Sequence, residues 1–472
     1  MDENTLYNKI SMLEKDKIYS AILLGINILF YLFFAAYDGF AIAPDSPTYI
    51  SMTLYREPVY CIFLAILRTL FELIGVAHSE FYLTVAVYIQ SLLAAYAIWC
   101  LAEYLRKEFI LTYLQTGVVV LIPMIISLIC RSSEKISMYP TSILTEGITC
   151  SLFLVYTRYL LEYLYKNSRK SLIASTVLSF ILISTRKQMC ITVILLAIVV
   201  CWIYFLQKRI KNGILIALLC VCCILCSNWT LETVYNYFVH GEIETHSGDN
   251  RFLATVAIYT SERSYGEEIE DDEAQELFYM IYDECNTNGY LKNSAGKGLN
   301  SRVHHFHDNY DNVQLVTMWS MIREHVYANY KGDKVYLEKK VDEITRQITK
   351  GLLPNAWKDM IGCSIETFLS GIVVTAVGIP EEMYLVLLSP IVYLLYFLLF
   401  VTHVKNEGMT KLSYLAVCVI LFIVINVAVI SMVIFCSPRY TIYNTPLLYI
   451  ALWILIVKNV KSQVRCKRLI IK

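Results

Sequence analysis

The sequence predicts an all-α polytopic membrane protein with about ten transmembrane helices. Of its 472 residues, 57% are hydrophobic and only 17% are charged, whereas soluble domains average ~45–50% and ~25%. Uncharged apolar runs of about 20 residues, the length that crosses a bilayer, recur along the chain. Charge is also unevenly placed, because residues 233–382 hold 24 acids and 13 bases, although both totals are 40. This distribution indicates membrane-spanning parts and one acidic soluble part.

Ten runs fit membrane spans and divide the chain into three parts. They are residues 18–37, 81–102, 110–130, 143–161, 171–185, 189–206, 213–230, 383–401, 412–435 and 441–457. Residues 1–232 form an N-terminal transmembrane module of seven spans with a first outer loop at 38–80. Residues 233–382 form an extracytoplasmic soluble domain. Residues 383–472 form a three-span module with a basic tail.

The bases predict the orientation, because cytoplasmic loops carry the excess of Lys and Arg. If the chain starts inside, 20 of the 27 bases outside residues 233–382 are cytoplasmic, and both termini are cytoplasmic as well. Seven bases remain on the opposite side, namely Arg56, Arg68, Arg131, Lys135, Arg186, Lys187 and Arg439. The formal net charge of zero makes a nucleic-acid partner improbable.

Both long outer segments are expected to be helical. Residues 60–74 are apolar apart from Arg68 and Glu72, an i,i+4 pair, and predict an interfacial helix. Helical patterns at 273–283, 313–328 and 335–348 predict a mostly helical outer domain. Its acidic run at 267–276 is either a solvated helix start or a cation site. Cys285 and Cys363 lie in this domain, and spacing alone does not show whether they pair.

Charged residues beside the spans are candidate functional residues, because charge near a membrane is costly. Asp45 lies between two prolines in the first outer loop, where it is either a turn or cap residue or a reactive carboxylate. Arg56 and Tyr60 follow it. Glu146 opens the fourth span, and the alternative there is a carboxylate favoured by the helix N-terminus.

Three bases lie at the same outer level. Arg186 and Lys187 separate the fifth and sixth spans, and Arg439 with Tyr440 follows the ninth. Anchoring to lipid headgroups is the alternative for each. Together with the two carboxylates, they suggest chemistry on a lipid phosphate. A carboxylate would deprotonate an incoming hydroxyl, while a positively charged Arg or Lys would neutralise the charge on a departing phosphate.

These features resemble the GT-C superfamily of integral-membrane glycosyltransferases, which includes aminoarabinose transferases and protein O-mannosyltransferases. Asp45 resembles the family's catalytic Asp. Four further pairs resemble motifs of the family, namely Arg56 with Tyr60, Thr145 with Glu146, Arg186 with Lys187, and Arg439 with Tyr440. It covers residues 18–206 best and the outer domain hardly at all. Ser46 stands where the mannosyltransferases carry a second acid, so catalysis would rest on Asp45, helped by Glu146 or a metal.

The resemblance implies inverting transfer from a polyprenyl-phosphate sugar to a hydroxyl of an envelope lipid, glycan or protein. The site would face away from the cytoplasm, in a bacterial inner (plasma) membrane. The cofactor expectation is none, or a divalent metal ion. His304, His305, His307 and Asp308 are ligand types for such an ion, but their spacing fits no ligand motif.

Two other functions stay open. A multi-span polysaccharide polymerase or ligase also uses lipid-linked sugars, but relies on outer Arg and His rather than a first-loop Asp. A transporter or flippase is the non-enzymatic alternative. It is less favoured, because transporters commonly use helices broken by Gly or Pro at the membrane midplane. This chain has only 18 Gly and 10 Pro, and few of them lie within a span.

Overall fold

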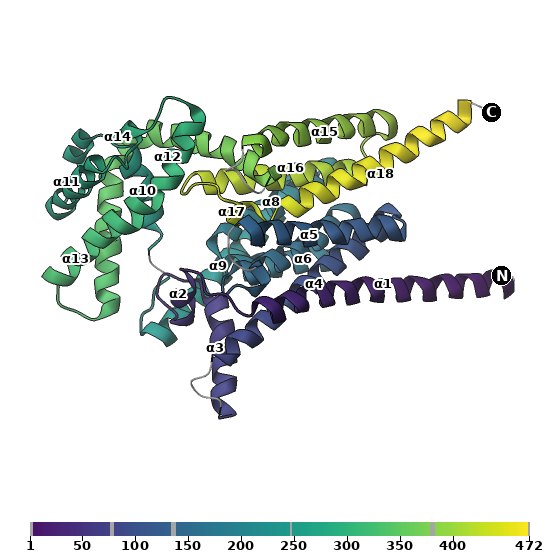
Figure 1. Ribbon diagram of the computed structural model, residues 1–472, viewed down its shortest axis with the longest axis horizontal. Helices are drawn as coiled ribbons and strands as arrows, with labels where there is room; N and C mark the ends of the chain where they lie inside the picture. Colours follow the sequence, from purple (N-terminus) through teal and green to yellow (C-terminus); the bar gives the residue numbers. More distant parts are fainter. Residues whose placement is uncertain (1–2, 76–79, 134–137, 246–247, 378–382, 471–472) are drawn as a thin grey trace.

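The computed structural model describes residues 3–75, 80–133, 138–245, 248–377 and 383–470, with side chains described for 14–75, 80–131, 138–245, 248–377 and 386–460. Within these residues every regular element is a helix, apart from one isolated bridge between Ala41 and Ser142. The all-α prediction is therefore confirmed. A helical bundle and a helical domain make up the molecule (Figure 1).

The bundle is formed by the two ends of the chain. Its long helices are α1 (Glu3–Asp38), α4 (Phe81–Phe109), α5 (Tyr113–Ser133), α6 (Glu146–Lys166), α7 (Arg169–Ile183), α8 (Cys190–Leu206), α9 (Ile210–His240), α15 (Met383–Glu407), α16 (Lys411–Ser431) and α18 (Thr445–Ile470). Short helices join them: α2 (Ser46–Ile50), α3 (Pro58–Leu73), η1 (Tyr139–Thr141), η2 (Lys187–Met189) and α17 (Pro438–Thr441). Each predicted span corresponds to one long helix.

Eight described helices are long and apolar enough to cross a membrane. Seven coincide with predicted spans, and the eighth is α14, which belongs to the domain. The remaining predicted spans correspond to α6, α7 and α18. Helix α6 carries charges yet is mostly buried, because α4 and α7 pack against it. A helix shielded from lipid by protein does not need the hydropathy of an isolated span.

Ion pairs at both ends of the bundle fix the directions of its helices. We call the end that faces the domain the domain end, and the end with both chain termini the termini end (Figure 1). At the termini end, Glu108 of α4 pairs with Lys166 of α6 at 3.3 Å and also with Lys411 of α16. At the domain end, Asp38 of α1 pairs with Arg131 of α5 at 2.7 Å. Helices α1 and α5 therefore end at the domain end, whereas α4 and α6 end at the termini end.

The predicted interfacial helix is present as α3. Figure 1 shows α3 running across the direction of the bundle at the domain end. Arg68 and Glu72 lie 3.9 Å apart on it, as the i,i+4 spacing predicts. Ile66, Leu70 and Leu73 are exposed along the same helix.

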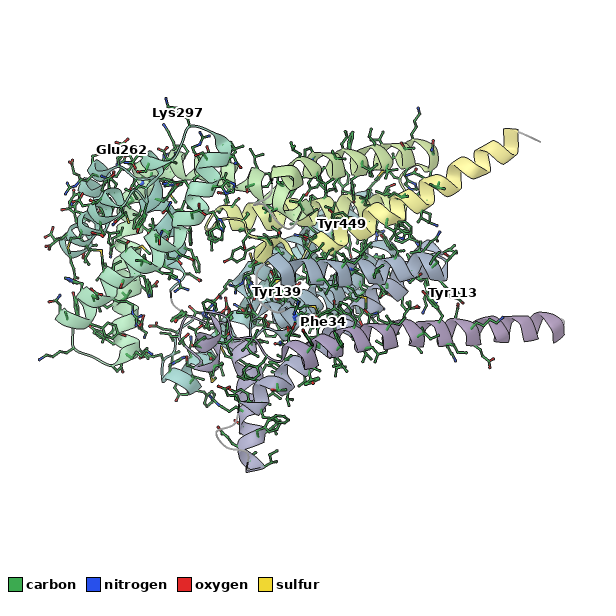
Figure 2. The ribbon with its side chains drawn as sticks, viewed as in Figure 1. Phe34, Tyr113, Tyr139, Glu262, Lys297 and Tyr449 are labelled. Atoms are coloured by element: carbon green, nitrogen blue, oxygen red, sulfur yellow. The ribbon has the colours of Figure 1, made fainter. Side chains whose placement is uncertain are left out.

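The domain is helical, as predicted, and has its own apolar core. It consists of α10 (Asn250–Thr260), η3 (Arg263–Glu268), α11 (Asp272–Thr287), η4 (Lys292–Ser294), α12 (Leu299–Asp311), η5 (Asn312–Trp319), α13 (Ser320–Asn329) and α14 (Lys334–Val377). The acidic run starts α11, where the Asp271 side chain accepts a hydrogen bond from the Ala274 amide at 2.8 Å. Cys285 and Cys363 are both buried and free. Charged side chains such as Glu262 and Lys297 lie at the domain surface (Figure 2).

Helix α14 connects the domain to the bundle. Val341 and Ile348 near its start lie in the domain core, whereas Gly371 near its end meets α16. A Cβ atom added at Gly371 would lie 2.5 Å from Val427 and 2.7 Å from Cys436. Glycine therefore permits this close helix contact.

We expect G371A to lower the thermal unfolding midpoint in detergent, because overpacking a close contact costs about 1–3 kcal/mol. The matched control is G362A on the same helix, where nothing lies within 4 Å of the added Cβ. Alanine favours a helix over glycine by about 1 kcal/mol, so G362A should melt at or above the wild-type temperature. Equal midpoints for the two variants would contradict the contact.

Candidate functional site

The candidate site lies at the domain end of the bundle, where four segments meet. The first outer loop is pinned to the entry of α6, because the Ala41 amide bonds the Thr141 carbonyl and the Ile143 amide bonds the Ala41 carbonyl, both at 2.9 Å. The Ser46 hydroxyl also donates to the Ile143 carbonyl, at 2.8 Å. Asp45 precedes this serine, so these bonds bring its carboxylate toward the first turn of α6.

Five predicted residues form one connected charge network, namely Asp45, Arg56, Glu146, Arg186 and Arg439. In the Asp45 carboxylate, Oδ1 lies 2.6 Å from Arg56 and Oδ2 lies 2.9 Å from Arg439. Arg439 also pairs with Glu146. Glu146 in turn pairs with Arg186, which precedes α8. Residues up to 394 positions apart in sequence thus share one ion-pair chain.

The charge network carries one excess positive charge, because three guanidinium groups face two carboxylates. The Glu146 side chain is 0% exposed, while that of Asp45 is 35% exposed. The partly exposed portion of the network is thus the Asp45 end. Excess positive charge that solvent can reach favours binding of an anion.

Aromatic side chains hold two of the arginines. The Arg56 guanidinium lies 4.3 Å from the centre of the Tyr49 ring and donates to the Tyr49 hydroxyl at 3.0 Å. Arg186 lies 5.3 Å from the Tyr440 ring. Such cation–π contacts hold a guanidinium without neutralising its charge.

Two predicted binding residues make their polar contacts outside the charge network. The Tyr60 hydroxyl donates to Gln90 at 2.9 Å, and its buried ring lies 5.3 Å from the Tyr49 ring. The Lys187 side chain pairs with Glu232 of α9. Tyr60 therefore supports Tyr49 from behind, and Lys187 joins η2 to α9.

The electrostatic surroundings keep Asp45 ionised. Burial raises the pKa of the Asp45 carboxyl, but the charges and hydrogen bonds of Arg56 and Arg439 outweigh burial and hold that pKa below its ordinary value. In the domain, burial and the nearby Asp45 carboxylate raise the pKa of Asp311. The domain thus places a second acid, one that protonates more readily, near Asp45.

Arg251 is a site residue that sequence reasoning missed. It opens α10, with its guanidinium 5.1 Å from the Tyr55 ring and 5.4 Å from the Trp319 ring. Burial and the like charge of Arg56 lower the pKa of Arg251. Among the described residues, the Arg251 Nε has no hydrogen-bond partner. No motif marks it among the 13 bases of residues 233–382.

Gln90 and Glu232 were also missed, although the sequence holds a signal for both. Each is a polar residue within or beside an apolar run, and such residues usually face protein rather than lipid. Gln90 donates to the carbonyls of Pro140 and Ser142 at 2.9 and 3.1 Å. It therefore helps to hold the segment that leads to Glu146.

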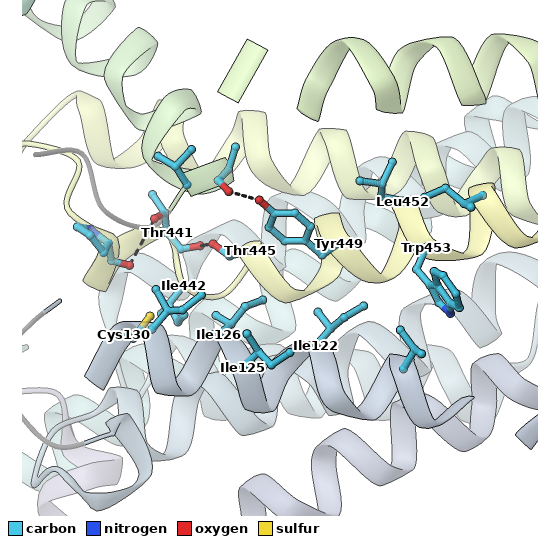
Figure 3. Close-up of a pocket in the computed structure, with 16 residues that line it drawn as sticks. Ile122, Ile125, Ile126, Cys130, Thr441, Ile442, Thr445, Tyr449, Leu452 and Trp453 are labelled. Atoms are coloured by element: carbon cyan, nitrogen blue, oxygen red, sulfur yellow. Dashed lines mark hydrogen bonds between the residues drawn. The ribbon is translucent and has the colours of Figure 1, made fainter. Parts of the chain in front are cut away.

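An apolar groove of about 400 Å³ lies between α5 and α18 (Figure 3). Ile122 and Ile126 of α5 line one wall, and Tyr449 and Trp453 of α18 line the other. Pro438 lines its end toward the site, and the next residue is Arg439 of the charge network.

The histidine cluster offers no evident metal site. Within the described residues, no group of three or more His, Cys, Asp or Glu side chains is placed to hold a metal ion. His305 bonds the Tyr259 hydroxyl and the Gly289 carbonyl, each at 3.0 Å. The His307 ring lies 4.3 Å from the Phe435 ring. These two histidines have contacts typical of a domain interior and its interface with the bundle.

No protein-family model and no curated protein matches the chain. Among solved structures, it is similar to the crystal structure of ArnT from Cupriavidus metallidurans in the apo state. The match has 12% identity and a TM-score of 0.30, and covers 94% of this chain and 78% of that chain. Similarity at this level assigns no role to any residue of the site.

We expect E146Q to destabilise the protein by about 3–5 kcal/mol, because it leaves buried arginines without their carboxylate. The matched control is E162Q on the same helix, where Glu162 pairs with Arg158 at 3.3 Å and both are 22% exposed. That pair should be worth about 0–1 kcal/mol. Thermal unfolding of the two variants in detergent measures the difference, and equal losses would argue against a buried network.

Asp45 should make stability depend on pH. Because its folded pKa is below its unfolded value, the ionised carboxylate stabilises the fold above about pH 4, the ordinary Asp range. That contribution is lost as pH falls through the lower folded pKa. The gap in melting temperature between wild type and D45N should therefore be full at pH 7 and shrink at the acid end. A gap that does not change with pH would contradict the pairing.

Proposed function

We propose that this integral-membrane protein is a glycosyltransferase of the GT-C kind. It moves a sugar from a polyprenyl-phosphate donor to a hydroxyl of an envelope lipid, glycan or protein, with inversion. The observation that carries this proposal is a net-positive charge network next to an apolar groove, since Pro438 lines the groove and its neighbour in sequence is Arg439 of the network. A lipid phosphate has both matching parts, an anionic head and an apolar tail.

The groove suits the donor's tail and the charge network its phosphate. Pro438 at the end of the groove adjoins Arg439 in sequence, so a tail among Ile122, Ile126 and Tyr449 would deliver its phosphate toward Arg439. Bidentate guanidinium contacts are strong phosphate ligands. Arg186, held over Tyr440 and paired to Glu146, would supply a second cation.

Asp45 is the proposed general base. In the reaction, the acceptor oxygen attacks the anomeric carbon, the bond from that carbon to the phosphate oxygen breaks, and the electron pair leaves with the phosphate. The acceptor proton passes to Asp45. Both Asp45 oxygens are engaged by Arg56 and Arg439. A donor phosphate that draws Arg439 away would free Oδ2 to accept the proton.

Glu146 is then a positioning residue rather than a catalytic one, because its side chain is 0% exposed and lies behind the two arginines. Arg251 and Asp311 lie on the domain side of Asp45. They are the candidates to meet the acceptor. The proposal places the site on the extracytoplasmic side, since both termini and most bases of the bundle then lie in the cytoplasm.

The test is sugar transfer by purified protein supplied with polyprenyl-phosphate sugars and candidate acceptors. D45N should lose about 10²–10⁴-fold in rate, the usual contribution of a general base. It should still bind the donor, because all three arginines of the charge network remain. The matched control is D38N, which removes a carboxylate paired to Arg131 at the same end of the bundle but outside the charge network.

Three outcomes separate the alternatives. Loss of transfer in D45N with retention in D38N supports the proposal. Transfer that D45N does not impair favours the polymerase or ligase that relies on outer Arg and His. Absence of transfer by wild type with every donor tried contradicts the glycosyltransferase proposal.

A further inference from the structure

The second half of α14 exposes a continuous apolar row. Leu353, Trp357, Ile361, Ile365 and Leu369 are each between 41% and 55% exposed. They follow one another at intervals of four residues, so consecutive members are neighbours on the helix surface. An apolar row of this length is rarely left facing water.

Two of the three charged residues of this half-helix pair with the domain, and the third, Lys358, is exposed beside the Trp357 ring. Asp359 pairs with Lys292 at 2.6 Å, and Glu366 pairs with Arg302 at 2.7 Å. The helix is therefore amphipathic, with two carboxylates paired to the domain and an apolar side whose residues are about half exposed. Amphipathic helices of this kind bury their apolar side in a membrane surface.

Helix α14 does not itself cross the bilayer. Helix α16 runs from the termini end, where Lys411 pairs with Glu108, to the domain end, where Arg439 follows it. Helix α15 must then run from the domain end to the termini end. Helix α9 arrives at the domain end, since Glu232 pairs with Lys187 there. The chain enters and leaves α10–α14 at the same end, and no other helix of this segment is long enough to make a compensating crossing.

The last turn of α14 is nevertheless seated among membrane helices. The Thr445 hydroxyl donates to the Thr375 carbonyl at 3.0 Å, and the Tyr393 hydroxyl donates to the Ile372 carbonyl at 2.9 Å. The Tyr449 hydroxyl of α18 donates to the Ala376 carbonyl, as Figure 3 shows. The apolar row thus leads from the domain down to helices that lipid surrounds, and it is continuous with the exposed apolar face of α15.

We propose that residues 365–377 of α14 are embedded in the leaflet on the domain side, with the end of the apolar row, Ile365 and Leu369, against lipid acyl chains. The helix enters this leaflet without crossing to the other one. It anchors the domain to the membrane surface beside the connection that leads from α14 into α15. This inference does not depend on the proposed enzymatic function.

The test uses added tryptophans and brominated lipid. I365W and L369W place the probe on the apolar row. L387W places it on the exposed face of α15 and serves as the lipid-facing control, and V316W places it on exposed η5 of the domain and serves as the water-facing control. Each variant is reconstituted in phosphatidylcholine nanodiscs with or without dibrominated acyl chains. Iodide serves as the aqueous quencher, and gel filtration checks that each variant is folded.

The added emission of I365W and L369W should be lost in brominated lipid to the same extent as that of L387W, and iodide should not quench it. V316W should show the opposite pattern. If I365W and L369W behave like V316W, the row lies in water and the proposal is overturned. If neither quencher reaches them, protein covers the row, for example a second copy of the chain, and the proposal is equally overturned.

Discussion

The arrangement of the site depends on the cost of burying a carboxylate at the end of a membrane bundle. Glu146 is completely buried, so its charge is tolerable only with cations and hydrogen bonds around it. Arg186 and Arg439 supply them from two different connections of the bundle. Because Arg439 also holds Asp45, the first outer loop is tied to the same point. One buried acid thereby sets the relative positions of four chain segments.

Asp45 is held by two arginines, yet the charges of the network do not balance. Each carboxylate oxygen of Asp45 has a guanidinium partner, which makes the carboxylate a weak base. The surplus cation means that an arriving anion is attracted rather than repelled. Competition between that anion and Asp45 for Arg439 would couple donor binding to activation of the base. Unlike a preformed catalytic dyad, such a site becomes reactive only when occupied.

The spans and the gathering of the charged site residues could be predicted from the sequence, whereas the individual side-chain partners could not. The spans follow from apolar runs, and their up-and-down order brings Asp45, Glu146 and Arg439 to one level. What the sequence does not show is which neighbour each long side chain chooses. Tyr60 turns to Gln90 and Lys187 to Glu232, because those partners come from helices whose rotation only packing determines. Helix α14 was assigned wholly to the soluble domain, because its polar first half and the surrounding acidic residues mask its apolar second half.

The sequence distance between Glu146 and its partners also has a consequence for biosynthesis. Arg439 lies 293 residues after Glu146 and is separated from it by the entire domain. During synthesis, the nascent N-terminal module must therefore hold the Glu146 carboxylate with Arg186 alone until the domain, α15 and α16 have been made. The Arg439 contact forms late in assembly, since only α18 follows it in the chain. A ribosome-bound chain that ends before Arg439 would present a Glu146 carboxylate paired with Arg186 alone.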